Sequence, residues 1–177
     1  MEWLNEPPAW AEHDGALHVT TAPDTDFWRT TRYGFVRDTG HFRHTGATGD
    51  FAARVRIEGS YRDQYDQAGL MVRLDAENWL KCGIEYVDGR QWASAVITRG
   101  LSDWSVVPLD PAPASVCFEV RRTAEAVEVL YGEAVPDRLL RLGALTIVRK
   151  LQVGVMAASP DGAGFDVVLR DFRLTGA

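Results

Sequence analysis

Residues 65–105, with the sequence YDQAGLMVRLDAENWLKCGIEYVDGRQWASAVITRGLSDWS, decide the fold class. They contain three strand-like runs, Ala68–Leu74, Trp79–Tyr86 and Trp92–Arg99, separated by turn-forming segments at 75–78 and 87–90. Side chains alternate between the two faces of a strand, so the run 79–86 is expected to have one core face and one outer face. We assign Leu80, Cys82, Ile84 and Tyr86 to the core face, and Trp79, Lys81, Gly83 and Glu85 to the outer face.

The outer face of this run combines an indole, a cation and an anion with a glycine between the two charges. A strand that merely faces solvent has no need of this combination, whereas the floor of a binding cleft does. The sequence therefore predicts a cleft over residues 79–86.

Similar strand-like runs recur along the chain, at 16–20, 50–58, 115–122, 127–131, 151–157 and 164–174, with turn clusters between them. Helical periodicity is weak throughout. Residues 136–145 fit either a short helix or a strand, and residues 39–50, TGHFRHTGATGD, are interpreted as a polar loop. Ten or more short strands in 177 residues favour an all-β fold, an antiparallel β-sandwich of the jelly-roll type, as one domain over residues 1–177. The cleft would lie on its concave sheet face.

Composition excludes several classes of function. The net charge is −6 and no Lys/Arg cluster stands out, so we expect no nucleic-acid partner and no binding to anionic membranes. The N-terminal residues do not resemble a signal peptide, and no run of 18 apolar residues occurs. Cys82 and Cys117 lie in apolar strand patterns and are expected to be buried, reduced thiols. These features favour a cytoplasmic location, and open sheet edges make a homodimer plausible.

Short motifs in this order, Asp26-Phe27-Trp28, DQAG at 66–69, WLK at 79–81, SDW at 102–104 and Ala158-Ser159-Pro160, resemble the DUF1349 family over nearly the whole chain. That family is similar to the concanavalin A-like lectin/glucanase superfamily, so the resemblance implies a jelly-roll sandwich. It implies no particular function. The matching positions give one ligand-binding site as a hypothesis: Asp66, Gln67, Trp79, Lys81, Glu85, Thr98, Ser102, Asp103 and Trp104.

The residue types at this site suit a carbohydrate. A sugar ring has an apolar face that stacks on indole and a rim of hydroxyls that needs charged or amide partners. Trp79 and Trp104 would supply the indoles; Asp66, Gln67, Lys81 and Glu85 would supply the rim. We therefore predict a non-catalytic, lectin-like domain for a carbohydrate or a small polar metabolite. A small anionic metabolite held by Lys81 and Arg73 is a variant of this hypothesis.

Glycoside hydrolysis is the first alternative. It needs two carboxyl groups about 5 Å or about 6.5–9.5 Å apart, and the E-x-D-x-x-E pattern common in glucanases is missing here. Glu85 would have to act with Asp66 or Asp103 from another segment. Lys81 is expected to lower the pKa of Glu85, which suits a nucleophile more than a general acid. Two further alternatives are a regulatory module that binds a metabolic enzyme and a face that only stabilises the sheet.

No cofactor or metal is predicted. His41-x-x-His44 lacks a third ligand nearby, the glycines at 40–49 do not form a phosphate-binding motif, and Cys82 has no activating base in the sequence. The aromatic residues of Asp26-Phe27-Trp28 either line the rim of the cleft or close the end of the sandwich, and we favour the rim.

Overall fold

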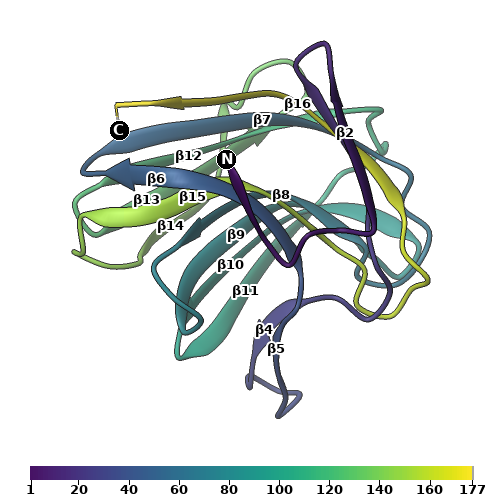
Figure 1. Cartoon of the computed structure of the whole chain (residues 1–177), viewed down its shortest axis with the longest axis horizontal. Coiled ribbons are helices and arrows are strands. Elements are labelled where there is room, and N and C mark those ends of the chain that lie inside the picture. Colours follow the sequence, from purple (N-terminus) through teal and green to yellow (C-terminus); the bar gives the residue numbers. More distant parts are fainter. Residues whose placement is uncertain (177) are drawn as a thin grey trace.

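The computed structural model of the chain describes residues 1–176, and two seven-stranded antiparallel sheets pack face to face in it (Figure 1). Sheet A has the strand order β1-β6-β15-β8-β9-β10-β11, and sheet B has the order β14-β13-β12-β7-β16-β3-β2. The predicted all-β sandwich is thus confirmed. None of the residues from 1 to 176 forms a helix, and so none forms a helix able to cross a membrane.

The strands of sheet A are β1 (Glu2–Leu4), β6 (His41–Thr48), β8 (Gln67–Arg73), β9 (Asn78–Val87), β10 (Arg90–Arg99), β11 (Leu101–Pro108) and β15 (Lys150–Ala158). Those of sheet B are β2 (Ala9–His13), β3 (Ala16–Thr20), β7 (Phe51–Gly59), β12 (Val116–Thr123), β13 (Ala126–Gly132), β14 (Arg138–Ala144) and β16 (Asp166–Thr175). A separate two-stranded hairpin is formed by β4 (Phe27–Arg29) and β5 (Val36–Asp38).

The space between the two sheets is filled by apolar side chains, which we call the main core. Leu70, Leu80 and Ile84 enter it from sheet A, and Ile57 and Phe118 enter it from sheet B. All five are essentially inaccessible to solvent. In sheet B, β7 is buried at every second residue, as expected for a strand with one face in a core, whereas β8 of sheet A is buried along its whole length.

A second, smaller apolar cluster lies on the other side of sheet A, and we call it the hairpin core. Phe27 and Trp28 come from the β4–β5 hairpin, and they pack on outward-facing side chains of sheet A. Figure 1 shows the hairpin projecting beside β8–β11, away from sheet B. The hairpin therefore buries an outer sheet face that would otherwise meet solvent. The complete cluster is Phe27, Trp28, Phe42, Met71, Trp79, Val96, Met156 and Ala158.

One segment differs from the expectation drawn from the sequence, and a second segment, for which two structures were possible, adopts one of them. Residues 39–50 are not a loop: residues 41–48 form β6, which pairs with β15 along its whole length. The polar composition of this strand obscures it in the sequence. In the structure, Phe42 enters the hairpin core and Ala47 enters the main core. The backbone of β6 pairs with that of β15. Residues 138–144, which fitted a helix or a strand, form the edge strand β14.

Candidate functional site

The floor of the site is made by the outward-facing side chains of β8, β9 and β10. The predicted faces of residues 79–86 are confirmed, because Leu80, Cys82 and Ile84 lie in the main core while Trp79 lies in the hairpin core. On the outer side, Gly83 separates Lys81 from Glu85 and stands opposite Gly69 of β8. A Cβ atom on either glycine would collide with the backbone of the other strand, so glycine is required at both positions.

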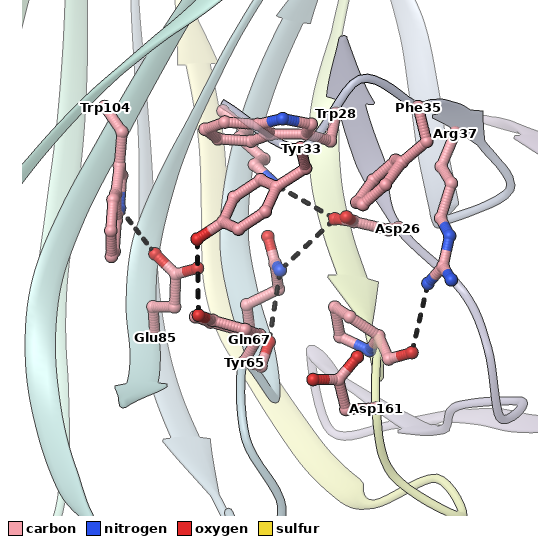
Figure 2. A pocket seen from close by; sticks show the side chains of 12 residues that line it. Asp26, Trp28, Tyr33, Phe35, Arg37, Tyr65, Gln67, Glu85, Trp104 and Asp161 are labelled. Carbon is pink, nitrogen blue, oxygen red and sulfur yellow. Dashed lines mark hydrogen bonds and ion pairs between the residues drawn. The ribbon is translucent and has the colours of Figure 1, made fainter. Parts of the chain in front are cut away.

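A pocket of about 150 Å³ lies above this floor. Figure 2 shows Trp28 over the pocket and Trp104 on one side, with Phe35 and Arg37 on the opposite side. The polar floor and the aromatic sides come from five separate segments of the chain. The lining residues are Asp26, Trp28, Tyr33, Phe35, Arg37, Tyr65, Gln67, Lys81, Glu85, Trp104, Pro160 and Asp161.

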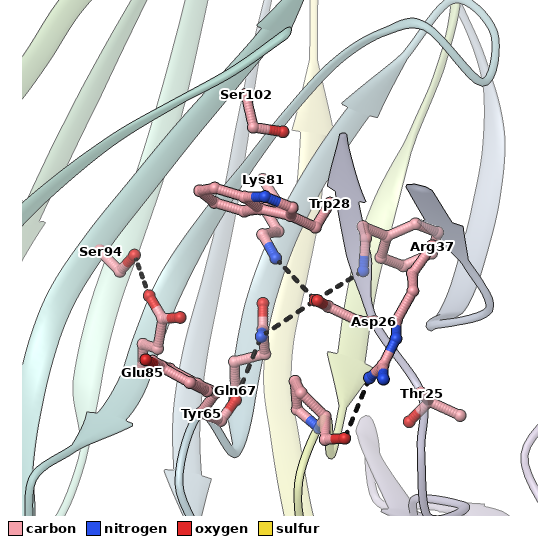
Figure 3. Close-up of polar contacts among 12 residues, drawn as sticks. Thr25, Asp26, Trp28, Arg37, Tyr65, Gln67, Lys81, Glu85, Ser94 and Ser102 are labelled. Atoms are coloured by element: carbon pink, nitrogen blue, oxygen red, sulfur yellow. Dashed lines mark hydrogen bonds and ion pairs between the residues drawn. The ribbon is translucent and has the colours of Figure 1, made fainter. Parts of the chain in front are cut away.

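Lys81 and Asp26 form a buried ion pair at the floor (Figure 3). Lys81 Nζ lies 3.2 Å from Asp26 Oδ1, and both side chains are less than a tenth exposed. The same oxygen accepts the backbone N–H of Phe27 at 2.7 Å and the amide of Gln67 at 3.5 Å. The Lys81 ammonium has three N–H donors, and among residues 1–176 this is its one hydrogen bond. Two donors of a buried cation therefore make no hydrogen bond to the described residues.

Glu85 is held at the other end of the floor by two donors to one oxygen. Ser94 Oγ donates to Glu85 Oε2 at 2.6 Å, and Trp104 Nε1 donates to the same atom at 2.8 Å. Within residues 1–176 no hydrogen bond is made to Oε1. Burial raises the pKa of Glu85, and this effect outweighs the lowering by Lys81 and by the two donors. The expectation that Lys81 would leave Glu85 with a lowered pKa is thus wrong, because the carboxyl group lies deeper than a strand facing solvent would place it.

The wall of the pocket is the β4–β5 hairpin, which is fastened to the rest of the molecule on three sides. Arg29 donates to Gly100 O at 3.1 Å, and its backbone N–H donates to Ser102 Oγ at 2.9 Å. Arg37 donates to Pro160 O at 3.1 Å. At the tip, the hydroxyl groups of Tyr33 and Tyr65 lie 3.4 Å apart. The hairpin is therefore a fixed wall.

Four of the predicted site residues line the pocket: Gln67, Lys81, Glu85 and Trp104. Trp79 does not, because its indole is 1% exposed and lies beneath the hairpin, in edge-to-face contact with Phe27. Thr98 and Ser102 are buried and share a 2.8 Å hydrogen bond; Ser102 also accepts the Arg29 N–H, so this pair anchors the hairpin.

The two acids considered as partners of Glu85 lie outside the pocket. Asp66 is fully buried, where it accepts the backbone N–H groups of Arg62 and Asp63 and the hydroxyl of Ser159. Its role is to hold the loop before β8. Asp103 is on the opposite face of β11 from Trp104, and Arg141 of β14 donates to it at 2.5 Å. This contact ties the edges of the two sheets together.

Arg73 also lies outside the pocket. It forms a bidentate pair with Asp38, with both N–O distances at 2.7 Å, and so is not free to hold an anionic metabolite. Of the two aromatic residues for which the rim was favoured, Trp28 lines the pocket, whereas the expectation is wrong for Phe27, which is fully buried in the hairpin core. Asp26 also lines the pocket.

Sequence reasoning missed the remaining lining residues, Tyr33, Phe35, Arg37, Tyr65, Pro160 and Asp161. The segment 27–37, FWRTTRYGFVR, carried a usable signal, since it alternates aromatic and arginine residues around a glycine. In the structure Tyr33 stacks on Phe35, and the Arg37 guanidinium lies 4.9 Å from the centre of the Phe35 ring. Such a cluster on a short hairpin is typical of a binding surface.

No metal centre is found in the part of the chain that the structure describes, where no three His, Cys, Asp or Glu side chains are grouped to hold an ion. His41 hydrogen-bonds instead to the backbone of Asn5 and Ala22. Cys82 and Cys117 are free and buried, as expected, and burial raises the pKa of Cys82 far above its ordinary value.

Among curated proteins, Regulation of enolase protein 1 from Saccharomyces cerevisiae is 40% identical over 177 residues, which cover 98% of this chain and 88% of that protein. The uncharacterized protein AN7484 from Emericella nidulans is 29% identical over 126 residues, which cover 66% of this chain and 63% of that protein.

Among solved structures, a functionally unknown protein from Saccharomyces cerevisiae is similar with a TM-score of 0.93 and 36% identity, over 99% of this chain and 96% of that one. The carbohydrate binding module CBM66 from Bacillus subtilis has a TM-score of 0.63 and 12% identity, over 97% of this chain and 94% of that one. Bacteroides ovatus xyloglucan PUL GH43B has a TM-score of 0.69 and 19% identity, over 93% of this chain and 34% of that one. At these low identities the last two show a shared fold alone.

The family comparison covers almost the whole chain. The model of DUF1349, a family described as protein of unknown function, matches residues 3–177, and the motifs that line or anchor the pocket fall within that range. The chain belongs to the DUF1349 family.

Proposed function

We propose that this protein binds a carbohydrate or a small polar metabolite in the pocket between the β4–β5 hairpin and sheet A, and that it releases the ligand unchanged. The observation that carries the proposal is the grouping of polar atoms that lack a protein partner with aromatic walls. Lys81 has donors and Glu85 an acceptor with no partner in residues 1–176, and Trp28, Tyr33 and Trp104 surround them. A hydroxyl-rich ring is the class of ligand that uses both.

The shared fold supports the proposal in a coarser way. A carbohydrate binding module and a GH43 protein have the same sandwich architecture, so the scaffold is of a sugar-binding type. The site itself argues against the hydrolase alternative as it was first framed, because neither Asp66 nor Asp103 reaches the pocket that holds Glu85.

The test is a thermal-shift screen of sugars, sugar phosphates and common metabolites, followed by isothermal titration of each compound that shifts the midpoint. A ligand at a hundred times its Kd stabilises the native state by about 2.7 kcal/mol, which raises the midpoint of a chain of this size by about 5–10 °C. Recovery of the ligand unchanged supports binding without catalysis. Product release that Glu85→Gln abolishes would replace the proposal by a hydrolase.

A matched pair of tryptophan variants locates the binding. Trp104 is 36% exposed and donates its indole N–H to Glu85; Trp10 is 39% exposed and donates to Glu6 at 2.7 Å, outside the pocket. Trp104→Ala should weaken binding by about tenfold or more, and Trp10→Ala should leave it unchanged. Equal loss in both variants would place the ligand elsewhere.

A further inference from the structure

From the shape and charge of the same pocket, we infer that the ligand is a single, uncharged sugar ring at the end of a chain or free in solution, recognised through two neighbouring hydroxyl groups. This inference rests on the proposed function and narrows it to a ligand class and a mode of binding.

The size of the pocket limits the ligand to one ring. Pockets for drug-sized ligands have volumes of about 300–1,000 Å³, and this one measures about 150 Å³. Its sides are formed largely by aromatic rings, with Arg37 beside Phe35, and Trp28 and Tyr33 pack edge to face at 5.7 Å between centres. The walls are thus poorly suited to opening for a second ring inside the pocket.

The hairpin closes one end of the pocket, so that a polysaccharide cannot run through it. An open sheet face would form a groove across the strands, in which several consecutive sugar rings could lie. Here the hairpin stands across that path, fixed to Gly100 and Ser102 at one end and to Pro160 at the other. Figure 2 shows Arg37 and Phe35 at this closed side and Trp104 across from them. A ring can enter only with the rest of its chain pointing to solvent.

The charges of the lining favour a neutral ligand. Two cationic side chains, Lys81 and Arg37, face three acidic ones, Asp26, Glu85 and Asp161. Asp161 is exposed, so solvent screens the surplus negative charge and little attraction remains for a cationic ligand. Lys81 is paired with Asp26, and Arg37 donates to a backbone carbonyl. A phosphate or carboxylate on the ligand would therefore meet no excess of positive charge, and it would lie near the buried acids.

The polar groups of the floor match two adjacent hydroxyls. Lys81 offers N–H donors, while within residues 1–176 the side-chain carbonyl oxygen of Gln67 and the Oε1 atom of Glu85 accept no hydrogen bond. Figure 3 shows Gln67 between the Lys81–Asp26 pair and Glu85. Each hydroxyl both donates and accepts, so neighbouring hydroxyls can bridge such alternating groups. The apolar face of the ring is left for the indoles.

Isothermal titration with defined probes tests the inference. The neutral probes are D-glucose, D-galactose, D-mannose, D-xylose, D-fructose and L-arabinose; the charged probes are D-glucose 6-phosphate, D-glucuronate and D-glucosamine. For the neutral sugar that binds, the matching deoxy sugars and oligosaccharides of increasing length are titrated next. Trp104→Ala reports whether the signal comes from the pocket, with Trp10→Ala as the control.

We expect one neutral sugar to bind, and its charged derivatives to bind at least about tenfold more weakly. Removal of either of two adjacent hydroxyl groups should weaken binding by a similar factor. Molar affinity should stay within about threefold as the oligosaccharide lengthens, because one ring makes the contacts.

Affinity that rises steadily with chain length, or preferred binding of a charged probe, would overturn the inference while leaving the proposed function standing. Failure of every saccharide to bind would remove both the inference and the carbohydrate form of the proposed function.

Discussion

The main core and the hairpin core lie on opposite faces of sheet A and are buried to a similar degree, but they differ in chemistry. The main core is formed by apolar side chains such as Leu70, Leu80 and Phe118. The hairpin core places Trp79 and Met71 beside the charged side chain of Lys81, which is 4% exposed. Glu85, further along the same sheet face, is 7% exposed. Apolar burial stabilises without needing partners, whereas each buried charge needs one. The comparison suggests that the main core supplies stability and that the hairpin core supplies the site.

Truncation of one buried phenylalanine in each core should have the largest effect and should separate the two roles. Phe118 and Phe27 are both fully buried. Phe118→Ala should lower the free energy of unfolding by about 3–5 kcal/mol without changing ligand affinity in the folded protein. Phe27→Ala should lower it by no more than this and should also abolish ligand binding, because the hairpin loses its packing on sheet A. Urea unfolding and titration of the ligand identified in the screen measure both quantities. Loss of affinity in a folded Phe118→Ala variant would contradict the division.

Breaking the buried ion pair should have an effect on stability of similar size. Lys81→Met leaves Asp26 buried without its cation, and it should lower the free energy of unfolding by about 3–5 kcal/mol. Adding Asp26→Asn to Lys81→Met should recover much of this loss, because the remaining charge is removed. The double-mutant cycle in urea measures the coupling between the two side chains. Additive losses would show that the pair does not act as a unit.

Glu85 should make stability depend on pH in a defined direction. Burial raises the pKa of Glu85, so the folded protein binds this proton more tightly than the unfolded chain does. The contribution of Glu85 is then fully present below its ordinary pKa of about 4.3 and is lost as the pH rises through the raised value. Glu85→Gln removes this loss. The difference in free energy of unfolding between wild type and Glu85→Gln should therefore shift against the wild type as the pH rises. A difference that is constant across the pH range would show that the pKa of Glu85 is not raised.

A surface ion pair between the β4–β5 hairpin and the turn that joins β8 to β9 should give the smallest effect. Glu77 lies 2.8 Å from Arg29, but its side chain is 62% exposed. Glu77→Gln should change the free energy of unfolding by about 0–1 kcal/mol and leave the pocket intact, because solvent screens exposed charges. The same measurements used for Lys81→Met check this, and a loss as large as that of the buried pair would remove the distinction between the two.

The parts of the fold that depend on local alternation could be predicted from the sequence. Residues 16–20 form the expected strand, and residues 79–86 have the expected faces. Both could be predicted because the two-residue period of a strand is visible in neighbouring side chains. The strand β6 escaped prediction because its few apolar residues serve two different cores. Its partner β15 lies more than a hundred residues away in sequence, so local patterns cannot reveal the pairing.

The site could be predicted only where it lies on regular strands. Lys81 and Glu85 followed from alternation, but the docking of the hairpin buried Trp79, and burial of Glu85 raised its pKa. In the segment Ser102-Asp103-Trp104, the three neighbours respectively anchor the hairpin, tie β11 to β14 and line the pocket. A motif treated as one functional unit in sequence is thus divided among three structural tasks, and only the contacts distinguish them.

The β4–β5 hairpin has a consequence for how ligand choice could diversify. The floor of the pocket is built into sheet A, where a change disturbs packing, whereas Tyr33 and Phe35 belong to a short connection between two three-residue strands. Loops of this kind accept substitutions and changes of length at little expense to the remainder of a fold. Related chains can therefore differ in the connection between β4 and β5 while the floor on sheet A is kept. New ligand specificities would then arise from changes in about six residues, with Lys81 and Glu85 in place.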